Sequence, residues 1–247
     1  MDTKIFAQLF PSARPDAATW CGALASAFAA GEINTPRRVA HFLGQTGHES
    51  IRFTSISESL DYTPERLLQV FGTSRISPLD ARNLGRVPGR AADQEGIAYT
   101  VYGGAWGRKN LGNLSAADAW AFRGGGLIQL TGRSNYQRVA SILGITPEAL
   151  ADQVRTPTGA AMASALWWRA SGLNALADAD DHAAVTRKVN AASLGAAERK
   201  AITLKAASLL GQSGRPAVPV KASSTPVVKP AQTADDLNAA FLASLRG

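Results

Sequence analysis

Cysteine is nearly absent from this chain, since Cys21 is the only one among 247 residues. A single thiol cannot form a disulfide within the chain, so the fold does not depend on disulfides, which suits synthesis in a reducing cytoplasm. We expect Cys21 to be a small buried apolar residue. Long apolar runs are also missing, which argues against a transmembrane helix. Residues 1–16 lack the basic and apolar regions of a signal peptide.

Histidine is scarce as well, and only His41, His48 and His182 occur. No second histidine follows His48-Glu49 at the spacing of a zinc-protease helix, and there is no cysteine cluster. The three glycines at 124–126 lack the Lys-Ser/Thr ending of a phosphate-binding loop and do not match a dinucleotide fingerprint. We therefore expect no catalytic metal and no cofactor.

Acidic residues are fewer than basic ones, which gives a net charge of +7 and a pI of about 9.9. Such a protein is attracted to polyanions, whether nucleic acid, anionic membranes or the bacterial wall. The basic residues are scattered, and no dense Lys/Arg run alternates with aromatic residues. Nucleic acid is therefore not an expected partner.

Start and stop signals of helices recur along the chain. A hydroxyl residue before a proline is a typical helix N-terminus, because the hydroxyl accepts from a free N–H and the proline has no N–H to satisfy. Glycines at 31, 72, 103–104, 144, 172 and 211 are candidate helix ends. These signals predict an all-α fold of about nine to eleven helices, with one strand candidate at 54–60 and at most a minor β-hairpin. The start signals are Thr35-Pro36, Thr63-Pro64, Ser77-Pro78, Thr146-Pro147 and Thr156-Pro157.

The composition changes near Gly211. Residues 212–234 are rich in Pro, Ala, Ser and Val without a helical period, which is typical of a flexible linker. Residues 235–247 predict a short amphipathic helix or tail. The expected organisation is a catalytic domain over 1–211, a linker and this tail.

Carboxylates are the remaining candidates for chemistry. On the helix predicted from Thr35, the residues Phe42, Gln45 and Glu49 share one face, which ends in the carboxylate. A carboxyl group half-buried among apolar groups is favoured in its protonated form, as a general acid requires. The alternative is that Glu49 is a solvated residue at a helix end.

A second carboxylate, Glu58, follows nine residues later. On a continuous helix it would point about 180° away from Glu49, because each residue turns about 100°. Serines and β-branched residues in 50–57 predict instead that the helix ends and the chain turns. Glu58 is then able to face Glu49, and two opposed carboxylates are the minimal requirement of glycoside hydrolysis. Asp61 and Glu65 are alternatives, although Glu65 is better explained as a first-turn helix residue.

Several segments together resemble glycoside hydrolase family 19, and specifically its phage-endolysin branch within the lysozyme-like superfamily. The resemblance covers roughly residues 1–210 in the order of the family. It rests on HFLGQTGHES (41–50), ISESLDY (56–62), WAFRGGGLIQLTGRSNY (120–136), ALWWRASG (165–172) and TRKVNAASLG (186–195).

The resemblance implies a lysozyme-like, two-lobed helical domain with a central cleft. It implies that Glu49 is the general acid, that Glu58 is a base or charge stabiliser, and that Thr131 helps to hold the attacking water. The positions implied to line the sugar-binding cleft are Gln129, Asn135, Tyr136 and Asn190. Amides and a phenol suit sugar hydroxyl and N-acetyl groups, because they donate and accept hydrogen bonds.

Three features of the sequence depart from the family pattern. Gly125 stands where arginine is common, and Ala191-Ala192 stand where two glycines are common. No acidic residue follows Asn190 closely, since the next one is Glu198. This last departure puts the assisting charge network of the family's chitinases in doubt.

The expected function is that of a monomeric endolysin-type glycosidase that cuts the glycan strand of peptidoglycan. A chitinase and an inactive sugar- or wall-binding module are the alternatives. The bond cut and the choice between hydrolysis and transglycosylation stay open. We expect synthesis in the bacterial host cytoplasm and action on the cell wall or periplasm after release. The export route stays open between a partner membrane pore during phage lysis and delivery by a secretion machine.

Overall fold

The computed structural model describes residues 1–212 and contains fourteen helices within them. The predicted linker and tail lie outside the described residues, apart from Gln212 at the end of the last helix. The helices are α1 (Thr3–Leu9), α2 (Ala17–Ala30), α3 (Pro36–Glu49), α4 (Pro64–Phe71), α5 (Pro78–Leu84), α6 (Gln94–Tyr102), α7 (Gly104–Leu111), α8 (Ala116–Ala121), α9 (Arg133–Leu143), α10 (Pro147–Gln153), α11 (Pro157–Ala170), α12 (Leu173–Asp178), α13 (His182–Val189) and α14 (Ala196–Gln212).

The helix starts that the sequence predicts are confirmed. At all five hydroxyl–proline pairs the side-chain oxygen accepts from a backbone N–H three residues on, at 3.0–3.3 Å. Each such cap stabilises its helix by about 1 kcal/mol. The stop signals are confirmed in part. Glycines 31, 72, 103 and 144 follow helices directly, and Gly172 is the left-handed residue after the Ser171 cap of α11, whereas Gly211 lies inside α14.

Two sequence predictions about secondary structure are wrong. The helices outnumber the expected nine to eleven, because several, such as α8 and α12 with 6 residues each, are too short to leave a clear period. The strand expected at 54–60 is only an isolated bridge, in which Ser57 pairs with Gly125. Glycines 124–126 form two backbone hydrogen bonds with residues 56–58 and then turn away from them. No β-ladder therefore extends along the described residues.

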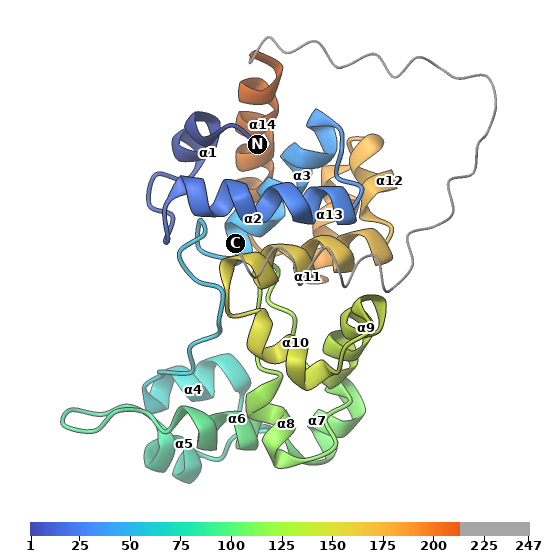
Figure 1. The fold of residues 1–247 in the computed structure, drawn as a ribbon. Helices are drawn as coiled ribbons and strands as arrows, with labels where there is room; N and C mark the ends of the chain where they lie inside the picture. The colour runs from blue at the N-terminus through green and yellow to red at the C-terminus, as the bar shows by residue number, and fades with distance from the viewer. Residues whose placement is uncertain (213–247) are drawn as a thin grey trace.

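The helices form two lobes, seen at the top and bottom of Figure 1. The upper lobe joins α1, α2 and α3 to α11–α14 around one apolar core, and the lower lobe is built from α4–α8 with a smaller core of its own. A third core, under α9, α10 and α11, lies between them. Within the upper lobe, α3 packs on α14 and α2 packs on α11. This is the two-lobed all-α fold that was expected.

None of the helices that the structure describes is long and apolar enough to cross a membrane.

Candidate active site

Glu49 is the last residue of α3, and buried Ser50 fixes the end of that helix. The Ser50 hydroxyl donates to the Thr46 carbonyl at 2.6 Å and accepts from the Phe53 backbone N–H at 2.9 Å. Because Ser50 is fully buried, water does not compete for these bonds. The orientation of the turn that carries Glu49 is therefore well defined.

The chain reverses directly after α3 through three consecutive left-handed residues. Ile51, Arg52 and Phe53 have φ angles of 49°, 58° and 62°, a region that costs non-glycine residues about 1–3 kcal/mol each. Burial of the Phe53 ring offsets this cost. The reversal confirms the chain turn predicted within 50–57, and it directs the chain towards Glu58. The Phe53 ring centroid lies 4.6–5.0 Å from those of Phe6, Phe10 and Trp20.

A buried guanidinium holds the Glu49 carboxylate. Arg199 of α14 donates from a terminal nitrogen to Glu49 Oε1 at 2.5 Å, and the side chains are 1% and 19% exposed. The expectation of apolar surroundings for Glu49 is therefore wrong, because the sequence pattern of one helix does not show what α14 contributes. The charged hydrogen bond from Arg199 fixes the position of the carboxylate.

Arg199 is itself fixed by two further acceptors. It donates to Gln45 Oε1 at 2.9 Å and to the Leu194 carbonyl at 3.0 Å. The Gln45 amide in turn donates to the Thr186 hydroxyl at 3.1 Å, and both of these side chains are buried. The general-acid candidate thus belongs to a network that joins α3, α13 and α14.

Glu198, beside Arg199, forms a second contact with the end of α3. Its carboxylate accepts from His48 Nδ1 at 2.9 Å and from Arg52 at 3.0 Å. Partial burial alone would raise the pKa of Glu198, but these two hydrogen bonds outweigh it and hold the pKa below its usual range. The first acidic residue after Asn190 therefore contacts the residue that precedes Glu49 in α3.

Glu58 is held from the lower lobe. Its Oε1 accepts from the Tyr102 hydroxyl of α6 at 2.7 Å, and its Oε2 accepts from the Gly124 backbone N–H at 2.9 Å. Burial, together with the charge of Glu58, raises the pKa of Tyr102 well above its usual value, so the phenol stays protonated and donates. Two donors, one on each oxygen, therefore fix the position of this carboxylate.

We expect the Tyr102→Phe variant to lose about tenfold in turnover and to unfold at a modestly lower temperature. The ring volume is kept, while a hydrogen bond to a charged group, worth about 1.5–3 kcal/mol, is removed. Steady-state rates and thermal unfolding measure the two effects. Tyr99→Phe is the matched control, because Tyr99 is an exposed residue of α6 that bonds Glu95 on the same helix. Equal rates in both variants would contradict a role for Tyr102 in positioning Glu58.

The glycines at 124 and 125 allow the backbone to approach the site. A Cβ at 124 would lie 2.6 Å from Gln129 Oε1 and 3.1 Å from Glu58 Cβ. A Cβ at 125 would collide with the Tyr136 hydroxyl. The position where an arginine is common in the resembled family therefore has no room for a side chain in this chain.

Three predicted site residues form one run of contacts beside these glycines. Asn135, which is exposed, donates to the Thr131 carbonyl at 2.9 Å. The Thr131 hydroxyl donates to the Gln129 carbonyl at 3.1 Å, and the Gln129 amide donates to the Gly126 carbonyl at 3.2 Å. The structure thus brings these residues together on the Glu58 side of the site.

Tyr136, the fourth predicted residue of this segment, does not lie on a surface. It is fully buried in the core under α9 and α10, and its hydroxyl donates to the Arg123 carbonyl at 2.9 Å. Burial raises the pKa of Tyr136 to about 12. The prediction that it binds sugar is wrong, because its ring completes the apolar core and its hydroxyl supports the loop backbone from behind.

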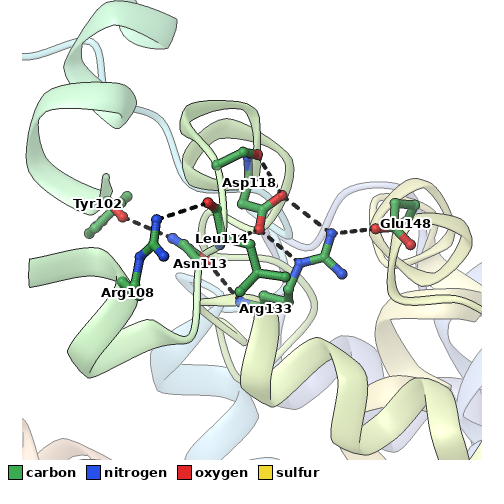
Figure 2. A network of polar contacts seen from close by, with 8 residues as sticks. Tyr102, Arg108, Asn113, Leu114, Asp118, Arg133 and Glu148 are labelled. Carbon is green, nitrogen blue, oxygen red and sulfur yellow. Dashed lines mark hydrogen bonds and ion pairs between the residues drawn. The ribbon is translucent and has the colours of Figure 1, made fainter. Parts of the chain in front are cut away.

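A polar network fixes the start of α9, directly after this loop (Figure 2). Arg133 donates to both Asp118 oxygens at 2.8 and 3.3 Å and to Glu148 at 2.5 Å, and its backbone N–H donates to Asn113 at 3.0 Å. Burial acts to raise the pKa of Asp118, but the hydrogen bonds, those of Arg133 first, lower it below its usual value. The network ties α8, α9 and α10 together behind the loop.

The other predicted residues lie elsewhere. Asn190 follows α13 and accepts from the Ala192 N–H at 3.0 Å, so its side chain holds the turn before α14. Asp61 pairs with Arg86 at 3.2 Å, which leaves Glu58 as the better second carboxylate. Glu65 lies in the first turn of α4, as expected.

Sequence reasoning missed Arg199 and Tyr102. Both act through contacts between distant segments, 150 and 44 residues from their partners. No local spacing signals such pairs. The position of Gln45 one turn before Glu49 was the available hint.

Comparison with known proteins gives a consistent picture. No family model matches the chain. A glycosyl hydrolase family 19 domain-containing protein of Haemophilus influenzae is 34% identical over 173 residues, which cover 69% of this chain and 78% of that protein. Among solved structures, a mutant of chitinase C has a TM-score of 0.52 and 19% identity, covering 87% of this chain and 78% of that one. Chitinase C from Streptomyces griseus has a TM-score of 0.51 and 20% identity, covering 87% and 94%. At these identities the two structures show similarity of fold alone.

Proposed function

Since this chain belongs to glycoside hydrolase family 19 and is a glycoside hydrolase, we propose that it cleaves the glycan strand of bacterial peptidoglycan. Glu49 is the general acid and Glu58 the second carboxylate. The observation that carries these roles is that each carboxylate is fixed from a different lobe, Glu49 by Arg199 and Glu58 by Tyr102 and Gly124. Paired carboxylates flanking the scissile bond are the apparatus of this reaction.

The different surroundings support different roles. Both oxygens of Glu58 accept hydrogen bonds, which suits a carboxylate that activates water or stabilises developing positive charge. Arg199 occupies Oε1 of Glu49 and leaves Oε2 to carry the proton for the leaving oxygen. A glycan seated over Glu49 excludes water from the place where the proton is transferred. Thr131, Gln129 and Asn135 are proposed to contact water or sugar beside Glu58.

The substrate proposal rests on charge. Peptidoglycan lies in an anionic wall matrix, whereas chitin is neutral, and the chain carries a net charge of +7. Long-range attraction raises the local concentration of a basic enzyme at an anionic surface. A wall-lytic role of the endolysin type, as in phage lysis, follows from this preference.

The direct test is to digest purified sacculi and N-acetylglucosamine oligomers with the same protein and to identify the products by mass spectrometry. We expect muropeptides with cleaved glycan to appear faster than shortened chitin oligomers. Chitin cleavage without release of muropeptides would assign the enzyme to chitin instead. No products from either substrate, with a folded protein, would favour a binding module.

We expect wall lysis to decline strongly with salt, while any cleavage of neutral oligomers stays nearly constant. The Debye length falls from about 10 Å at 0.1 M salt to about 3 Å at 1 M, so long-range attraction fades while contacts within the site persist. Measuring both rates over one salt series checks this, with the neutral oligomer as the internal control. Equal slopes for the two substrates would contradict the electrostatic origin of the preference.

A further inference from the structure

Two of the three histidines meet an aspartate at a place that the proposed reaction does not use. His41, in the middle of α3, lies with its Nε2 2.8 Å from Asp180 Oδ1, and His182 Nε2 lies 3.6 Å from the same oxygen. The two imidazole rings are 4.5 Å apart between centroids. One potential ligand atom from each residue falls within 4.8 Å of the others.

The buried histidine of this group has one ring nitrogen paired with Asp180 and the other unpaired within the described part of the chain. His41 is fully buried, and its Nδ1 has no hydrogen-bond partner among the described residues. A metal at Nε2 would not pair this Nδ1, so a metal site here rests on the positions of the two Nε2 atoms and Asp180 Oδ1. Asp180, which contacts this ring, lies in the turn between α12 and α13. Its backbone is left-handed, with a φ angle of 56°.

The group opens into a cavity. Its volume is about 560 Å³, and it lies among α3, α14 and the turn before α13. A ligand therefore has a route from solvent to His41 and His182, and there is room for water beside them. The lining residues include Arg37, Asp178 and Thr203, together with all three members of the group.

We propose that His41, Asp180 and His182 bind a divalent transition-metal cation, of which Zn²⁺ fits best. Two imidazole nitrogens and one carboxylate oxygen are ligands that zinc prefers, whereas Ca²⁺ and Mg²⁺ prefer oxygen alone. Tetrahedral bonds of about 2.1 Å place ligand atoms about 3.4 Å apart. The observed separations of 2.8 and 3.6 Å from Asp180 Oδ1 lie close on either side of this value. Water from the cavity supplies the fourth ligand.

The position of the site indicates a structural role rather than a catalytic one. Glu49 lies eight residues further along α3, about 12 Å along the helix axis. The ion would join α3 to the start of α13, whose Thr186 accepts from Gln45 in the network around Glu49. Metal binding therefore stabilises the upper lobe, and its primary effect is on unfolding.

The test uses the untagged full chain, stripped of metal by a chelator and titrated with Zn²⁺ in a calorimeter and in thermal unfolding. We expect one ion per chain and a rise in unfolding temperature, because a ligand that binds only the folded state stabilises it. His182→Gln and Asp180→Asn should each weaken binding at least about tenfold and remove the rise. These two positions are preferred because His41 is fully buried, so that its replacement is more apt to prevent folding.

His48→Gln is the matched control, since it removes the histidine that pairs with Glu198 outside this group. It should bind Zn²⁺ as the unmodified chain does. Binding that survives in His182→Gln, or that is lost in His48→Gln, would place the metal elsewhere and overturn the proposal. No binding by the stripped, folded chain would overturn it as well. Co²⁺ gives an independent readout, because a four-coordinate site produces visible absorption that His182→Gln should abolish.

Discussion

The Glu49→Gln variant is expected to lose about two orders of magnitude or more in the rate of glycan cleavage while remaining folded. Glutamine keeps the shape of the side chain but has no proton to transfer, and general acid catalysis contributes typically about 10²–10⁴-fold. Release of soluble products from sacculi measures the rate. Circular dichroism and thermal unfolding establish that the protein is folded.

The same substitution also disturbs the ion pair. The glutamine amide oxygen still accepts from Arg199, but the acceptor is now neutral instead of charged. The weaker hydrogen bond costs about 1 kcal/mol of stability. A modest drop in unfolding temperature is therefore expected together with the large loss of rate. Glu65→Gln is the matched control, because Glu65 is an exposed first-turn residue of α4. Near-normal lysis by folded Glu49→Gln would end the proposed mechanism.

The second large effect is expected at Arg199. Replacing it by methionine keeps an unbranched chain of similar reach but leaves Glu49, Gln45 and the Leu194 carbonyl without their donor. Removing one partner of a buried ion pair destabilises by about 3–5 kcal/mol, and partial exposure of Glu49 places this case near the lower value. Denaturant unfolding should show the loss, and activity should fall because the carboxylate is no longer held.

Arg199→Lys separates charge from geometry. Lysine retains a positive charge, but it cannot reproduce the forked donors that reach three acceptors at once. We expect a stability between those of the methionine variant and the unmodified chain, with turnover still reduced. A methionine variant as stable and active as the unmodified protein would show that the network does not matter.

Local chemistry explains what the sequence predicted correctly. The five hydroxyl–proline starts succeed because a cap needs only residues within one turn. The turn after Glu49 was predictable because serines and β-branched residues disfavour continued helix in 50–57. The strand prediction at 54–60 is wrong because alternation of residues does not supply a partner strand. Among the described residues, the segment that faces it turns away at Gly126.

Contacts across the chain explain what was missed. The surroundings of Glu49 depend on α14, and those of Glu58 depend on α6, so neither follows from its own helix or loop. Tyr136 illustrates the opposite error. Its place in the resembled motif suggested a sugar contact, whereas the packing of α9 on α10 puts its ring in the core.

The attachment of the two carboxylates has a consequence for the motion of the enzyme. Glu49 is hydrogen-bonded to α14 and Glu58 is hydrogen-bonded to α6. The segment between the two residues crosses from one lobe to the other (Figure 1). Their separation is therefore set by how the lobes sit against each other and not by the length of that segment. Any change in the position of one lobe relative to the other would therefore change the carboxylate spacing, and a sugar chain that drew the lobes together would adjust the gap in which its own bond is broken.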